Sequence, residues 1–230
     1  FHFATFRYLE TSAGILIYAL SGALLWPRSA GDELNRQGDV LWSEVQELWG
    51  FYRRYLEQGV MRAEAPALQA RLAGRMSQLA ATLQAALADT PTVIARKPEW
   101  ERLRVDMRAL SDALELWRES SDDCRRLDLG RLLPQLEFGL DTLGKRLDRA
   151  GELWRLRSTD ADLEDATDGA LLEPLRLDLD RLAATALPVF DRAALLSFVQ
   201  QLERLDAGSR DLLRTLQAIA GARPDRQIDR

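Results

Sequence analysis

Residues 100–117 read WERLRVDMRALSDALELW, and this stretch decides the fold class of the chain. Its large apolar side chains recur at alternating steps of three and four residues: Trp100, Leu103, Met107, Leu110, Leu114 and Trp117. That spacing places them along one side of an α-helix, as in the seam of a coiled coil. Pro98, just upstream, suits the first turn of such a helix.

The same periodicity continues on both sides of this stretch, and no segment after Arg28 has the alternation of a strand. It predicts an all-α domain of five to six helices, with an antiparallel hairpin formed by the third and fourth. The expected helices cover residues 32–58, 65–88, 98–117, 129–156, 171–186 and 191–220. Five tryptophans lie on or beside the apolar stripes and are interpreted as core residues: Trp42, Trp49, Trp100, Trp117 and Trp154.

Two stretches interrupt this pattern. Residues 89–97 contain Pro91 and are predicted to be a loop. Residues 158–169 (STDADLEDATDG) resemble a calcium loop only superficially: counting from Asp160, Asp165 stands where glycine is needed and Leu171 where a glutamate is needed. This second stretch is interpreted as a solvated linker.

The first 28 residues have a different character. Thr11 to Pro27 carry no formal charge, and helix over this length spans about 26 Å, close to the thickness of a bilayer's hydrocarbon core. Trp26, Pro27 and Arg28 then have the pattern of an interfacial exit. The segment is predicted to be a transmembrane helix; a buried core helix and a signal peptide remain open alternatives.

One face of this predicted helix is small and polar. Gly14, Ser21 and Gly22 lie on it, and such stripes pack against other helices within membranes. Arg7, Glu10 and Tyr18 share the same face. Arg7 and Glu10 are either an interfacial ion pair that ends the span or, with Tyr18, part of a substrate or proton pathway, because ionisable groups at membrane depth are costly.

Composition excludes several functions. The net charge of −5 and the absence of a basic block argue against a nucleic-acid partner. With His2 and Cys124 as the only histidine and cysteine, a zinc site and a Cys-His or Ser-His-Asp centre have no support, and no glycine-rich phosphate loop is present. Cys124 is interpreted as an incidental thiol. We therefore expect no enzyme, no metal site and no cofactor.

The opening segment FRYLETSAGILIYALSGALLWPRSAGDELNRQGDVLW resembles the last helix of the first membrane block in the fusaric acid resistance family, which includes aromatic carboxylic acid exporters. The resemblance is carried by Arg7, Glu10, Gly14 and the exit at residues 25–28. It implies a proton-driven exporter of aromatic or related organic acids in the bacterial inner membrane, working with a periplasmic adaptor protein. It also implies that the helical domain is cytoplasmic and that further membrane helices belong to the full-length protein.

These observations give three expected regions: a transmembrane helix over 1–28, a cytoplasmic all-helical domain over 29–222 and a polar tail over 223–230. The expected partners are the other transmembrane helices, membrane lipid, the adaptor and, as an open possibility, further copies of the chain. The alternative is a membrane-anchored helical interaction or scaffold protein, motivated by the apolar seams of the third and fourth helices. A soluble helical protein with a buried first helix is the third interpretation.

Overall fold

The computed structural model describes residues 11–12, 14–15, 30–59, 63–156, 173–183 and 187–220. All regular structure in these residues is helical, which confirms the all-α prediction for this part of the chain. The helices are α2 (Ala30–Gln58), α3 (Glu64–Asp89), α4 (Pro91–Ile94), α5 (Lys97–Asp123), α6 (Leu129–Leu132), α7 (Leu136–Leu156), α9 (Glu173–Ala183) and α10 (Val189–Ala220).

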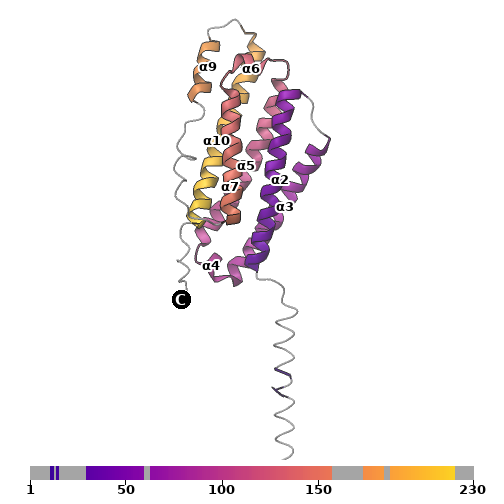
Figure 1. Ribbon diagram of the computed structural model, residues 1–230, viewed down its shortest axis with the longest axis vertical. Helices are drawn as coiled ribbons and strands as arrows, with labels where there is room; N and C mark the ends of the chain where they lie inside the picture. Colours follow the sequence, from indigo (N-terminus) through magenta and orange to yellow (C-terminus); the bar gives the residue numbers. More distant parts are fainter. Residues whose placement is uncertain are drawn as a thin grey trace, which may run out of the picture.

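The long helices lie side by side along the long axis of the molecule (Figure 1). α2 and α5 run in one direction, whereas α3, α7 and α10 run in the other. α10 packs along both α5 and α7, and α2 packs along both α7 and α3. The expected hairpin between the third and fourth helices is therefore wrong, because α5 has α10 as its main neighbour and α7 lies between α2 and α10.

Glycines on α2 and α7 explain this pairing. A Cβ atom at Gly38 of α2 would lie 1.9 Å from the indole ring of Trp154 on α7, so only glycine leaves room for that ring. A Cβ atom at Gly144 of α7 would lie 3.1 Å from Nε1 of Trp49 on α2. Each helix thus receives a tryptophan from the other, and this fit is specific to α2 and α7.

The core is aromatic at its centre. Trp49 and Trp117 stack with ring centroids 5.3 Å apart, and Trp117 lies 6.0 Å from Phe198 of α10. All five tryptophans predicted to be core residues are at most 9% exposed. Burying rings of this size contributes strongly to folding, and the paired rings fix the spacing of α2, α5 and α10.

Proline residues set several helix boundaries. Pro91 and Pro98 occupy the first turns of α4 and α5, so the expected loop at 89–97 contains a single helical turn. The helix expected over 129–156 is interrupted between α6 and α7, because Pro134 offers no N–H and holds Leu133 in a non-helical conformation.

The described residues include no helix with the length and apolarity that a membrane crossing requires. The segment predicted to cross the membrane, residues 1–28, lies outside the described residues except for 11–12 and 14–15.

Candidate functional site

The six membrane-helix residues singled out from the sequence are mostly beyond this description. Arg7, Glu10, Tyr18, Ser21 and Gly22 lie outside the described residues. Gly14 is helical and exposed, and a Cβ atom there would meet nothing within 4 Å. Their roles in packing and in a substrate or proton pathway stay predictions.

The first and last long helices of the described domain begin and end, respectively, at the same end of the bundle. α2 begins and α10 ends beside α4, at the lower end of the bundle in Figure 1. Arg96, just after α4, donates a hydrogen bond of 2.6 Å from Nη1 to the carbonyl oxygen of Ala218. We call this region, formed by the start of α2, α4 and the end of α10, the connecting end.

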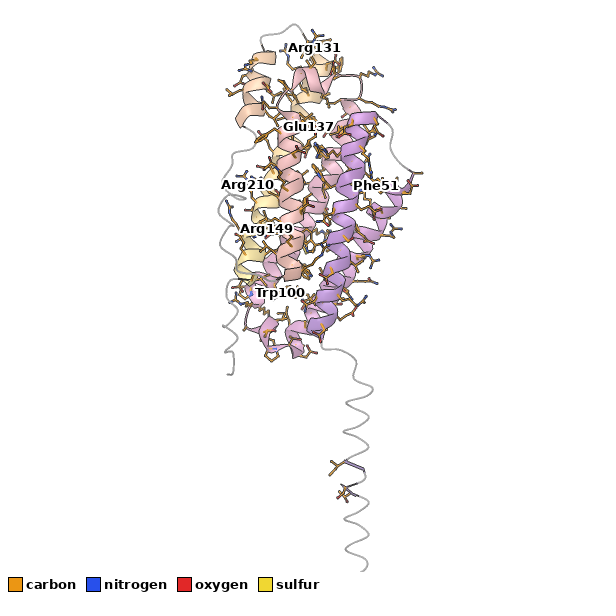
Figure 2. All side chains as sticks on the ribbon, in the orientation of Figure 1. Phe51, Trp100, Arg131, Glu137, Arg149 and Arg210 are labelled. Atoms are coloured by element: carbon orange, nitrogen blue, oxygen red, sulfur yellow. The ribbon has the colours of Figure 1, made fainter. Side chains whose placement is uncertain are left out.

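Two tryptophans tie the helices together at the connecting end. Trp154 donates from Nε1 to the carbonyl oxygen of Asn35 at 3.1 Å, joining the end of α7 to the start of α2. Trp100 packs edge-on against Trp154 with centroids 5.8 Å apart; Figure 2 shows Trp100 at this end and Glu137 near the other. The connecting end therefore has the packing of a core and holds α2, α5 and α7 in fixed relative positions.

A buried ion pair joins the two parallel helices α7 and α10. The guanidinium of Arg146 donates to the carboxylate of Asp206, and their side chains are only 2% and 1% exposed. Arg210 reaches the second carboxylate oxygen of Asp206 at 2.7 Å. Burial lowers the pKa of Arg146, while the charge of Asp206 acts in the opposite direction. Because an unpaired charge is very costly in a core, this pair fixes the register of α7 against α10.

Sequence reasoning missed this pair, although its signal was present. Arg146 falls at steps of three and one from Leu143 and Leu147, so it lies on the apolar stripe of its helix. Asp206 likewise directly follows buried Leu205. A charged residue in a core-facing position is the pattern to look for, since such residues are seldom fully buried without a partner.

Ion pairs at the surface link α2 to both of its neighbours. Arg53 contacts Glu137 and Asp141 of α7, and Arg75 of α3 lies 2.7 Å from Glu44. The acids at positions 137 and 141 are about half-exposed, so their pairs contribute little to stability. Glu44 is nearly buried, and its pair helps to hold α3 on α2.

The one cysteine is not built for reaction. Cys124 is fully buried, and burial, reinforced by the charges of Asp123 and Asp191, raises its pKa to about 12. A thiol in that state is a poor nucleophile. No group of three His, Cys, Asp or Glu side chains in the described ranges is arranged to hold a metal ion. What the described residues show is rigid coupling between helices.

Comparison with known proteins assigns the chain to a family. The family model of the fusaric acid resistance protein family matches residues 1–230. No curated protein and no solved structure matches the chain. Proteins of this family are membrane proteins that transport organic acids, and they are not enzymes. Because the match spans the whole sequence, the chain belongs to the fusaric acid resistance protein family.

Proposed function

We propose that this chain is part of a proton-driven exporter of aromatic organic acids, with residues 1–28 crossing the bacterial inner membrane and residues 29–222 forming a cytoplasmic domain. The carrying observation is that α2 begins and α10 ends together at the connecting end. A domain joined to the membrane from one side needs both of its connections on the face that meets the membrane.

The rigidity of the connecting end supports a mechanical role in this exporter. Trp100, Trp154 and the carbonyl of Asn35 form a continuous chain of contacts from α5 through α7 to α2. A displacement of α2 is therefore transmitted to the rest of the bundle, because packed cores do not deform gradually. In this proposal the domain holds the emerging helix in a fixed orientation.

Within the membrane helix, Arg7 attracts the substrate carboxylate, Glu10 exchanges a proton or pairs with Arg7, and Tyr18 lies on the same pathway. Gly14, Ser21 and Gly22 pack against neighbouring transmembrane helices of the full-length protein. Export to the outside proceeds with a periplasmic adaptor protein. These roles are motivated by the shared polar face of the helix in the sequence.

Efflux from cells tests the pathway. In the full-length protein, Arg7→Ala is expected to abolish export of an aromatic carboxylate and the resistance it confers, at equal amounts of protein in the membrane. Ser12→Ala, next to the same face, serves as the control and is expected to export normally. Full export by Arg7→Ala would remove Arg7 from the pathway.

Labelling in cells tests the side of the membrane. Phe190 at the start of α10 is 88% exposed, so Phe190→Cys in a Cys124→Ser background presents one accessible thiol. A membrane-impermeant maleimide is expected to label it only after the inner membrane is opened. Labelling in intact spheroplasts would contradict a cytoplasmic domain.

A membrane-anchored interaction or scaffold protein is the second candidate. Its original support, the seams of the third and fourth helices, is weakened because Leu103, Leu110 and Leu143 are buried within the chain itself. What favours it now is the end of the bundle opposite the connecting end, where Phe138, Val189 and Phe190 are exposed. A stable oligomer of the full chain that dissociates with Phe190→Ser, without loss of export, would favour a scaffolding surface there.

A further inference from the structure

A groove lies between α3 and α5, and its lining includes none of the ion-paired residues described above. It has a volume of about 610 Å³ and extends along α5 from Trp100 to Asp112. Leu79, Leu83 and Met107 are buried side chains that line it. The volume falls within the range of small-molecule sites, which are likewise mostly apolar with a few polar groups.

The groove exists because α3 packs against α2 and not closely against α5. Tyr52 of α2 donates to Gln69 of α3, and Thr82 of α3 donates to Gln37 of α2. Toward α5, α3 presents small side chains at Ala73 and Ala80, which do not fill the space between the helices. Met76 is only half-buried there, and the flexible side chains of Met76 and Met107 can adapt to differently shaped apolar bodies.

Two arginines give the groove its charge. Arg104 and Arg108 are one turn apart on α5, both line the groove, and both are exposed. Neither forms an ion pair with a carboxylate of the described residues, whereas Arg102 on the same helix lies 3.8 Å from Asp106. Like charges four residues apart repel each other, so an anion bound between them would relieve that repulsion. Asp112, at one end, is the acidic residue of the lining.

We propose that this groove binds a small amphipathic anion, with an aromatic body against Met76, Leu79 and Met107 and a carboxylate held by Arg104 and Arg108. Guanidinium groups bind carboxylates through paired, charge-assisted hydrogen bonds, which gives selectivity for the anion over a neutral analogue. The ligand class rests on the proposed function, since the exported acids have this chemistry. The lining of the site lies in the helical domain and includes neither Arg7 nor Glu10.

The position of the groove connects it to the rest of the molecule. Leu34, Trp100 and Trp154 border it, and the two tryptophans are those that hold the connecting end. A ligand in the groove therefore lies against the contacts that join α5 and α7 to α2. Because both tryptophans line the groove, binding is expected to change the tryptophan fluorescence of the chain.

Binding to the full chain in lipid nanodiscs tests this proposal. The probe is 1-naphthoate, with neutral 1-naphthamide as the matched ligand, measured by calorimetry and tryptophan fluorescence after subtraction of empty nanodiscs. A saturable naphthoate site that depends on Arg104 and Arg108 is expected, with naphthamide at least tenfold weaker at that site. Equal affinity for the two, or no saturable binding of naphthoate, would overturn the proposal.

Matched variants test which residues form the binding site. The double variant R104Q/R108Q is expected to weaken naphthoate at least tenfold, with R102Q unchanged. Ala73→Trp, which fills the groove from an exposed position, is expected to block both ligands, whereas Ala81→Trp on the same helix, outside the lining, is not. Undiminished naphthoate binding in R104Q/R108Q overturns the proposal, and because both arginines are exposed this variant remains decisive even if Ala73→Trp fails to fold.

The two proposals fail separately. Binding in nanodiscs requires no transport, so absent naphthoate binding in a protein that exports overturns only the groove. Tight, arginine-dependent binding in a protein that does not export supports the groove and contradicts the proposed function.

Discussion

The interfaces α2–α7 and α3–α5 show two outcomes of helix packing in one chain. At the first, Gly38 and Gly144 face Trp154 and Trp49, and each indole occupies space that a glycine leaves free. At the second, small residues such as Ala73 and Ala80 face no large partner, and a groove remains. Small residues therefore bring helices together only where a bulky side chain on the partner fills the space they leave.

Removing one partner of the buried ion pair should have the largest effect on the tightly packed side of the bundle. Asp206→Ala removes the carboxylate that faces the buried charge of Arg146, with an expected loss of about 3–5 kcal/mol in the free energy of unfolding. Urea denaturation followed by circular dichroism measures it. The double variant Arg146→Met/Asp206→Leu should recover most of that loss, and equal instability of the two would show that the pair is not what positions α7 against α10.

Thiol reactivity compares the packed core with the groove. Cys124, the C-cap of α5, is buried in the core, whereas Ser77 of α3 lines the groove. With a pKa of about 12 against 9.0 for a free thiol, native Cys124 holds about a thousandfold less thiolate at pH 8. Alkylation by iodoacetamide should be slower by at least that factor in the native than in the unfolded protein. A groove thiol, Ser77→Cys in a Cys124→Ser background, should react at the rate of a free thiol, and slow reaction there would mean that the groove is closed.

The same thiol predicts a pH dependence. Because the folded state holds the Cys124 proton more tightly than the unfolded state does, its contribution to stability is complete below pH 9 and is lost as the pH rises toward 12. Tyr52, whose pKa burial raises to about 12, acts in the same direction above pH 10. Urea midpoints between pH 8 and 11 should fall for the natural sequence and fall less for Cys124→Ala; identical slopes would contradict burial of the thiol.

Two glycine substitutions compare the filled α2–α7 interface with an open face of α3. Gly38→Ala forces a methyl group into the indole of Trp154 and should cost about 3 kcal/mol of unfolding free energy. Gly74→Ala, in the middle of α3 where a Cβ atom meets nothing within 4 Å, should stabilise the protein by about 0.5–1 kcal/mol. Thermal unfolding of the pair checks both signs, and similar effects at the two sites would show that Trp154 does not fill the space beside Gly38.

Much of the fold followed from periodicity. The predicted helices 32–58 and 65–88 match α2 and α3 to within two residues at each end, because their apolar stripes and flanking breaks are local features. Pro134 also signals the break, since a proline inside a helical pattern removes a hydrogen bond, whereas the helix expected over 129–156 runs through it.

The pairing of the helices and the groove could not be predicted from the sequence. An apolar stripe does not identify the stripe it faces, so the sequence pairs α5 with α7, whereas α10 covers α5 in the structure. The choice depends on contacts such as Gly38 with Trp154, 116 positions apart. Part of the candidate site could be predicted from the sequence. Arg146 and Asp206 are charged residues at core-facing positions of their helices, whereas Arg104 and Arg108 look like ordinary surface charges until α3 is placed beside them.

Proximity to the bilayer tests the central claim that the connecting end meets the membrane. Ile94 of α4 is 46% exposed at that end, and Phe190 is 88% exposed toward the other. Each position, replaced by cysteine in a Cys124→Ser background and labelled with a donor dye, can be measured by energy transfer to acceptor-labelled headgroups in nanodiscs. We predict clearly higher transfer from position 94 than from position 190; equal or reversed transfer would contradict the account.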